Sequence, residues 1–181
     1  MDCDCIILAG GESKRFGEDK LSTKVGAKTL LESVIDSVTP YFEKAWIVGG
    51  KENPDLIKAG PLGGIYTGLK LSNKRSFVIG GDMPFFNSKL ADILFEKKGE
   101  AVVPVHENGF IEPLFAFYEP SICPIIEDYV KEGERKIRGL LDRIDAHYIS
   151  VSELRVHDPD LKCFVNVNTK EDLSRTKQLL S

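Results

Sequence analysis

Short apolar segments alternate with amphipathic ones along the first part of the chain. Nearly uninterrupted apolar runs bounded by glycine and polar residues are typical of strands buried on both faces. Such runs lie at residues 5–9, 45–48, 76–79 and 101–105. Between them, apolar residues recur with the three- and four-residue spacing of an amphipathic helix. The helices predicted from this spacing cover residues 30–38, 62–71 and 88–97.

Strands that alternate with helices in this way are expected to form a mostly parallel sheet joined by right-handed crossovers. The second part of the chain is less regular: residues 110–118 are predicted to be extended, and residues 122–131 and 136–144 to be helical. Residues 164–169 are predicted to be a strand that runs into a helix, with the final asparagine or threonine as its N-cap. The whole pattern predicts a Rossmann-like three-layer α/β/α sandwich.

The length and composition of the chain indicate one compact domain. The chain has 181 residues, of which 42% are hydrophobic and 29% charged, and it contains no internal repeat or linker. We therefore expect a single domain over residues 1–181. No apolar stretch approaches the roughly 20 residues that cross a bilayer, and the acidic start differs from the basic start of a signal peptide. A cytoplasmic protein is expected, and its net charge of −4 argues against a protein that coats nucleic acid.

The cysteines and histidines show no spacing that predicts chemistry. Four cysteines in a chain of this size do not make a disulfide scaffold, and their positions match no usual zinc pattern. We expect free, structural thiols at Cys3, Cys5, Cys123 and Cys163. The histidines are scattered, so no catalytic role is predicted for them.

A glycine-rich loop follows the first predicted strand, at the sheet edge where doubly wound folds bind ligands. Gly10 and Gly11 permit close approach of the backbone to a phosphate, and Lys14, Arg15 and Lys20 add three cations. A polyphosphate ligand is therefore predicted. The alternative is an ordinary strand exit with solvated lysines. The loop lacks the Gly-Lys-Ser/Thr of a Walker A motif and the G-x-G-x-x-G spacing of a dinucleotide site.

Five segments together resemble one known family. The loop at residues 8–20, which reads LAGGESKRFGEDK, resembles the signature loop of nucleotidyltransferases. Four further segments narrow the match, at residues 60–65 (GPLGGI), 81–85 (GDMPF), 112–116 (EPLFA) and 164–169 (FVNVNT). Their order and approximate spacing resemble those of the molybdenum cofactor guanylyltransferase family, usually called MobA. The resemblance covers roughly residues 5–180.

The resemblance implies a nucleotidyltransferase fold and a specific reaction. Members of this family bind GTP and Mg²⁺, transfer GMP to the terminal phosphate of molybdopterin or the molybdenum cofactor, and release pyrophosphate. Nucleotide binding would fall to residues 1–105 and acceptor binding to residues 106–181. Proteins that deliver the finished cofactor are further expected partners.

The resemblance also assigns residues to the nucleotide site. Arg15 and Lys20 match the cations that bind the triphosphate and the departing pyrophosphate. The backbone of Leu8, Ala9, Gly10 and Gly11 and the second glycine loop, with Gly63, match nucleotide-binding segments. Without the motif, an exposed lysine paired with a neighbouring carboxylate is the favoured interpretation of Lys20, and Gly63 belongs to an ordinary loop-to-helix turn.

Asp82 is the predicted metal ligand and the third catalytic residue, beside Arg15 and Lys20. It follows a buried strand, and Mg²⁺ is commonly bound by one or two carboxylates plus substrate phosphates. An aspartate in this position can instead cap a turn. A second family aspartate precedes the Gly-Pro-Leu loop, and Asp55 is the nearest candidate, although its spacing leaves the match open.

Glu112, Asn166 and Asn168 resemble segments that border the acceptor side of the site. On a strand, the two asparagines would face the same way and could bind pterin edges; the alternative is that Asn168 caps the last helix and Asn166 serves a turn. Residues 133–136 also resemble a family segment. Two roles are open for the cations of these residues: binding the acceptor phosphate or capping the preceding helix. Alternating aromatic residues within 115–118 are expected to be core.

Two other functions stay open at this point. One is a related nucleotidyltransferase that uses CTP or a sugar-phosphate type of acceptor. The other is a nucleotide-binding adaptor without catalysis, against which the presence of Arg15, Lys20 and Asp82 speaks.

Overall fold

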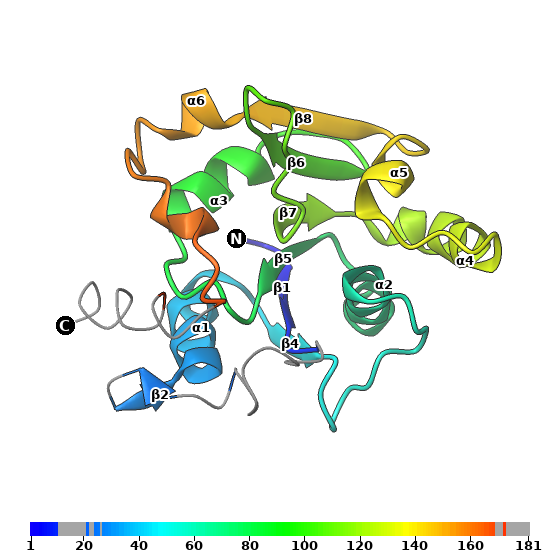
Figure 1. Cartoon of the computed structure of the whole chain (residues 1–181), viewed down its shortest axis with the longest axis horizontal. Helices are drawn as coiled ribbons and strands as arrows, with labels where there is room; N and C mark the ends of the chain where they lie inside the picture. Colours follow the sequence, from blue (N-terminus) through cyan, green and yellow to red (C-terminus); the bar gives the residue numbers. More distant parts are fainter. Residues whose placement is uncertain (11–20, 22–23, 26, 169–171, 173–181) are drawn as a thin grey trace.

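The computed structural model describes residues 1–10, 21, 24–25, 27–168 and 172 (Figure 1). Its strands are β1 (Asp4–Leu8), β2 (Lys24–Val25), β3 (Lys28–Thr29), β4 (Ala45–Val48), β5 (Ser76–Gly80), β6 (Ala101–Val105), β7 (Phe115–Tyr118) and β8 (Ala146–Ser150). Its α-helices are α1 (Leu30–Val38), α2 (Pro61–Ser72), α3 (Ser88–Phe95), α4 (Cys123–Lys131), α5 (Ile137–Leu141) and α6 (Val151–Leu154). Short 3₁₀ turns are η2 (Thr39–Tyr41), η3 (Pro120–Ile122) and η4 (Lys162–Phe164).

Six strands form one mixed sheet in the order β4-β1-β5-β7-β6-β8. Strands β4, β1 and β5 run parallel, β7 is antiparallel to both of its neighbours, and β8 is parallel to β6. The carboxyl ends of every strand except β7 therefore lie at one edge of this sheet. The predicted mostly parallel sandwich is confirmed, and strands from both parts of the chain share the sheet.

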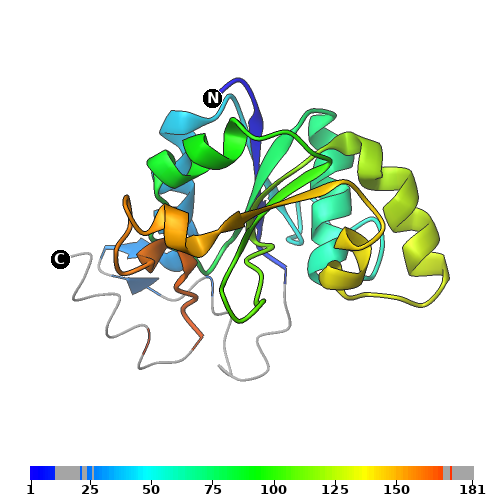
Figure 2. The same ribbon diagram turned by 90° about the horizontal axis from the view of Figure 1, so that it is seen from above.

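Helices cover both faces of the sheet, as Figure 2 shows. Because side chains alternate along a strand, Cys5 and Ile7 of β1 pack into one apolar cluster with α1 and α3, and Ile6 and Leu8 pack into another with α2 and α4. Residues of β5 and β7 divide in the same way, with Phe77 in the first cluster. The continuous apolar runs of the sequence reflect this two-sided burial.

The prediction of a strand over residues 164–169 is wrong, and strand β8 was not predicted from the sequence. Residues 162–164 form a 3₁₀ turn, and residues 165–168 belong to no strand. The Val167 N–H donates to the Asp82 carbonyl oxygen (2.9 Å) instead of joining a ladder. Strand β8 was not predicted because, as an edge strand with exposed His147 and Tyr148, it lacks a continuous apolar run.

All four cysteines are buried and free, as expected of thiols outside a disulfide scaffold. Burial raises the pKa of Cys3 to about 12 and that of Cys123 to about 11, so both thiols stay protonated near neutral pH. Among the helices in the described part of the chain, none is long and apolar enough to cross a membrane.

Candidate active site

The ends of β1, β4 and β5 are joined directly by backbone hydrogen bonds. The Ala9 N–H donates to the Val48 carbonyl oxygen (2.8 Å), and the Gly81 N–H donates to the Leu8 carbonyl oxygen (2.9 Å). These two bonds place the start of the first glycine loop between the end of β4 and the residue that precedes Asp82. The sheet edge thus brings together Leu8, Ala9 and Asp82, as the sequence predicted.

Gly10 lies against Gly49, and Gly49 has no room for a side chain. A Cβ on Gly49 would lie 2.5 Å from the Gly10 Cα, and Gly49 has a φ of +85°, which L side chains rarely adopt. Gly10 is exposed, so its backbone stays accessible at the sheet edge. The other predicted residues of this loop, Gly11, Arg15 and Lys20, lie outside the described residues.

Asp82 is half-buried directly beyond β5, and its carboxylate occupies space that Gly80 leaves open. A Cβ on Gly80 would lie 2.6 Å from Asp82 Oδ1. This cradle presents a hard oxygen donor at the carboxyl edge, which fits Mg²⁺. No group of three or more histidine, cysteine, aspartate or glutamate residues suited to a metal occurs in the described ranges. A metal here would therefore use Asp82 together with ligand phosphates, as Mg²⁺ commonly does.

The second glycine loop opens α2, and Asp55 lies beside it. The Asp55 carboxyl oxygens would each lie 3.6 Å from a Cβ on Gly63 or Gly64. Burial raises the pKa of the Asp55 carboxyl above its ordinary value. Its Oδ1 is buried and has no hydrogen-bond partner among the residues that the structure describes. A buried acceptor without a partner is costly, which makes Asp55 a candidate for donors on a ligand.

Gly63 is required by packing in addition to any role in the site. It is buried at the first turn of α2, where a Cβ would lie 2.3 Å from the Ile57 carbonyl oxygen. Because the Ile57 oxygen belongs to the backbone, it cannot shift out of the way as the end of a flexible side chain could. The glycine therefore lets α2 begin against the loop that carries Asp55.

Gly63→Ala is expected to destabilise the protein by about 1–3 kcal/mol, the usual cost of overpacking, in spite of alanine's better helix propensity. Urea unfolding followed by circular dichroism measures the change. Gly50→Ala is the matched control, because a Cβ at Gly50 meets nothing within 4 Å. Equal stability of Gly63→Ala and wild type would contradict the packing role.

On the predicted acceptor side, Glu112 is hydrogen-bonded to a histidine for which the sequence predicted no function. His106 Nε2 and Glu112 Oε1 are 2.8 Å apart. Desolvation raises the pKa of the Glu112 carboxyl, and the nearby His106 opposes this shift. The available sequence signal was a histidine at the end of a buried strand with a glutamate six residues later, a pattern too common to single out the pair.

Asn166 and Asn168 lie on the segment that contacts Asp82 through Val167. Val167 is fully buried, Asn166 is half-buried and Asn168 is exposed. Asn166 Nδ2 donates locally to the Phe164 carbonyl oxygen (3.4 Å), and the Asn168 N–H donates to Asp172 Oδ2 (3.0 Å). Because the segment is not a strand, the period-two argument for a shared face does not apply. The two asparagines flank Val167, whose N–H donates to the Asp82 carbonyl oxygen.

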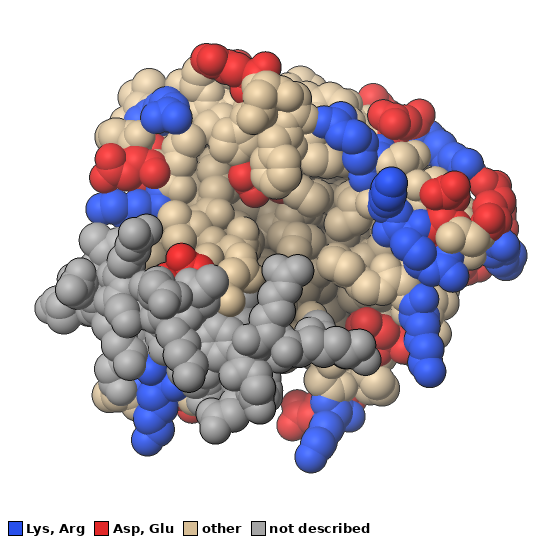
Figure 3. All heavy atoms as spheres, in the orientation of Figure 1, with Lys and Arg blue, Asp and Glu red and all other residues tan. Residues whose placement is uncertain are grey.

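The face that carries these residues is hollowed near its middle, with lysine and arginine side chains along the α4–α5 side (Figure 3). Arg135 Nη1 donates to the Val130 carbonyl oxygen (2.9 Å), so this cation caps α4, one of the two alternatives for residues 133–136. Arg138 donates to the Gly109 carbonyl oxygen and thereby ties α5 to the loop after β6.

The chain is similar to nucleotidyltransferases throughout its length. The family profile described as MobA-like NTP transferase domain matches residues 5–148. A probable molybdenum cofactor guanylyltransferase of Pyrococcus furiosus is 38% identical, with 96% of each chain covered. Another from Methanosarcina mazei is 35% identical, with 93% of this chain and 87% of that protein covered.

Solved structures agree with the sequence comparisons. The molybdopterin-guanine dinucleotide biosynthesis protein A of Archaeoglobus fulgidus superposes with a TM-score of 0.83 at 28% identity, covering 99% of this chain and 98% of that one. A 2-C-methyl-D-erythritol 4-phosphate cytidylyltransferase from Thermus thermophilus, at 13% identity and a TM-score of 0.69 with 99% of both chains covered, shares the fold. The chain is a nucleotidyltransferase that belongs to the MobA-like NTP transferase family, together with the molybdenum cofactor guanylyltransferases.

Proposed function

We propose that this protein transfers GMP from GTP to molybdopterin or its molybdenum form, which yields the guanine dinucleotide cofactor and pyrophosphate. The observation that carries the proposal is the hydrogen bond from the Gly81 N–H to the Leu8 carbonyl oxygen, which holds the residue where the first glycine loop begins next to the residue that precedes Asp82. Relatives at 38% and 35% identity that are named for this activity support the substrate pair.

The reaction requires charge neutralisation and alignment. An oxygen of the acceptor's terminal phosphate attacks the α-phosphorus of GTP, the bond from this phosphorus to the bridging oxygen breaks, and pyrophosphate leaves with the bonding electrons. Such transfers need little covalent help from the protein. In the proposal, the backbone of Leu8, Ala9, Gly10 and Gly11 holds the nucleotide.

Charged side chains complete the nucleotide site. Arg15 and Lys20 neutralise the triphosphate and the departing pyrophosphate, a role that rests on the sequence resemblance. Nucleotidyltransferases of this family generally use a divalent metal ion. We assign Mg²⁺ to Asp82, where the ion would neutralise phosphate charge during transfer. The Asp82 carboxylate, over Gly80, gives the proposal an oxygen donor at the right edge of the sheet.

Asp55 supports guanine as the base. The Watson–Crick edge of guanine carries two adjacent donors, N1–H and the 2-amino group, which match the two oxygens of a carboxylate. Cytosine lacks this pair of donors. Asp55 Oδ1 is buried without a partner among the described residues and lies beside Gly63 and Gly64. We therefore include Asp55 and the Gly63 loop in the guanine side of the proposed site.

Glu112, Asn166 and Asn168 complete the proposal on the acceptor side. The nucleotide part is taken as residues 1–105 and the acceptor part as residues 106–181. Cytoplasmic location fits the free thiols, and delivery proteins would receive the finished cofactor. Neither nucleic acid nor a membrane surface takes part in the proposed reaction.

A nucleotide panel tests the proposal. Purified protein is incubated with Mg²⁺, molybdopterin and one of GTP, CTP, ATP or UTP, and the products are identified by mass. The GMP adduct and pyrophosphate are expected with GTP, at a rate at least tenfold above the other nucleotides. A CMP adduct as the main product would support the cytidine-transferring alternative. Nucleotide binding without pyrophosphate release would support the adaptor.

A further inference from the structure

His106 and Glu112 form a half-buried polar pair at the carboxyl end of β6. Their side chains are 28% and 12% exposed, and Nε2 of His106 lies 2.8 Å from Oε1 of Glu112. Glu112 Oε2 has no hydrogen-bond partner among the described residues. The histidine thus fixes one carboxyl oxygen and leaves the other available to a ligand.

The loop between these two residues is held in one conformation by its own hydrogen bonds. The His106 N–H donates to the Phe110 carbonyl oxygen and the Gly109 N–H to the His106 carbonyl oxygen, each at 2.8 Å. Gly109 has a φ of +79°, which favours glycine at this turn. Arg138 of α5 contacts the Gly109 carbonyl oxygen. The position of Phe110 is therefore set by the fold.

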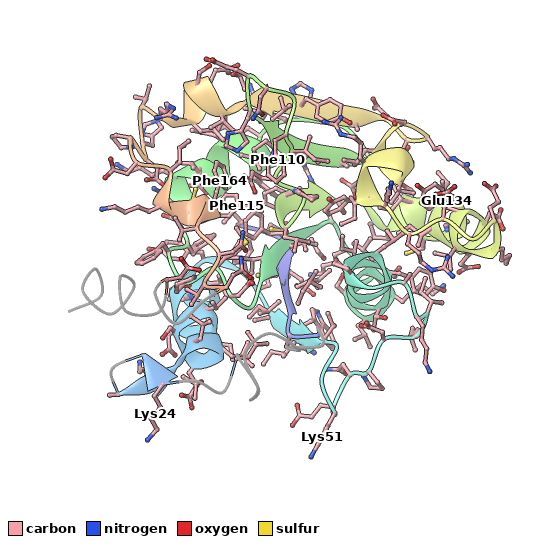
Figure 4. The ribbon with its side chains drawn as sticks, viewed as in Figure 1. Lys24, Lys51, Phe110, Phe115, Glu134 and Phe164 are labelled. Atoms are coloured by element: carbon pink, nitrogen blue, oxygen red, sulfur yellow. The ribbon has the colours of Figure 1, made fainter. Side chains whose placement is uncertain are left out.

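Phe110 is 61% exposed although the loop that carries it is firmly held. Its ring centroid lies 5.8 Å from the His106 ring, and the His106 ring lies 5.9 Å from the Phe164 ring. Phe164 in turn contacts Phe115 edge to face at 5.4 Å. Figure 4 shows Phe110, Phe115 and Phe164 gathered together, whereas Lys24, Lys51 and Glu134 lie far from them at the periphery. An exposed ring beside a half-satisfied carboxylate suits a planar polar ligand.

Backbone contacts connect this group to Asp82. Phe164 lies three residues before Val167, whose N–H donates to the Asp82 carbonyl oxygen (2.9 Å). Glu112 lies two residues before Leu114, whose carbonyl oxygen accepts from the Gly80 N–H (3.2 Å). Both segments therefore end next to the proposed transfer site, and the segment of Glu112 leads into β7, which lies on the far side of β5 from β1 and β4.

We propose that Phe110, His106 and Glu112 form the subsite that binds the fused heterocycle of the acceptor. Phe110 stacks on the ring, Glu112 accepts hydrogen bonds from its 2-aminopyrimidinone edge, and His106 is a positioning residue that orients Glu112. This inference rests on the proposed function. Guanine carries the same edge, so the test must separate the acceptor from the nucleotide.

The test compares Phe110→Ala and His106→Ala with wild type under anaerobic conditions. Each is expected to raise the KM for molybdopterin about tenfold, in line with the loss of one aromatic stack or one well-placed hydrogen bond, and to leave the KM for GTP unchanged. Phe110→Tyr and His106→Gln should recover most of the loss. Val156→Ala is the control for an exposed apolar side chain, since Val156 is 77% exposed.

Equilibrium binding of molybdopterin without GTP, followed by pterin fluorescence, keeps this inference separate from the proposed function. Weaker pterin binding by Phe110→Ala would support the subsite even if wild type formed no GMP adduct. Turnover by wild type with unchanged KM and Kd for molybdopterin in both alanine variants would overturn the subsite and leave the function intact. A raised KM for GTP alone would also overturn it. Because Phe110 is exposed, its variant remains informative if His106→Ala fails to fold.

Discussion

Replacing Asp82 by asparagine is expected to lower metal-dependent turnover on the order of 10²-fold or more, the range found when one charge-stabilising group is removed from an active site. The amide has nearly the same shape as the carboxylate, so the packing over Gly80 should survive. What is lost is the negative charge that would hold Mg²⁺ against the phosphates. Steady-state transfer of GMP at saturating substrates, with Mg²⁺ varied, measures the effect.

Asp92→Asn is the matched control, because Asp92 is an exposed aspartate on α3, away from the strand ends. It should retain wild-type turnover and the same dependence on Mg²⁺. The thermal midpoints of both variants should lie close to that of wild type. Turnover of Asp82→Asn within a factor of two of wild type would remove Asp82 from the catalytic residues.

Lys20→Ala is expected to lower kcat/KM for GTP by about 10- to 100-fold. A hydrogen bond to a charged group contributes about 1.5–3 kcal/mol, and each 1.36 kcal/mol corresponds to a factor of ten. The loss should show in the use of GTP, because the Lys20 ammonium is assigned to the departing pyrophosphate, where negative charge develops. Initial rates over a range of GTP concentrations give the value.

Lys24→Ala makes the same change of charge four residues further along the chain. Lys24 is an exposed residue of β2, and Figure 4 shows it at the outer edge of the molecule. Its replacement should leave kcat/KM for GTP within about twofold of wild type, since surface charges contribute little. Similar losses in both variants would indicate a general effect of positive charge and would argue against the specific role of Lys20.

The local pattern of apolar residues was sufficient to predict most strands and helices in the first part of the chain. The apolar runs predicted β1, β4, β5 and β6, and the helical spacing predicted α1, α2 and α3 within a few residues at their ends. These predictions succeeded because burial on both faces of a sheet, or on one face of a helix, leaves a direct trace in the order of apolar residues. Edge strand β8 leaves a weaker trace and was missed.

The segment that carries Asn166 and Asn168 shows where local pattern misleads. Alternating apolar and polar residues favour a strand, yet Val167 buries its side chain against Leu30 and donates its N–H to Asp82. A backbone hydrogen bond joins main-chain atoms and does not depend on the side chains of the two residues. The local sequence therefore does not show which residue is the partner. The same holds for the pairing of Ala9 with Val48 and of Gly81 with Leu8.

The sequence by itself determined the alternation of strands and helices and, through its motifs, the family; the roles of Lys20 and Asp82 are predictions from the same motifs. The tertiary structure decided that β7 enters the sheet antiparallel between β5 and β6, and that Glu112 meets His106. It also placed Asp55 beside Gly63. The physical reason is that these contacts depend on the order in which the strands lie in the sheet. Periodicity along the chain shows only which face of a single strand or helix is buried.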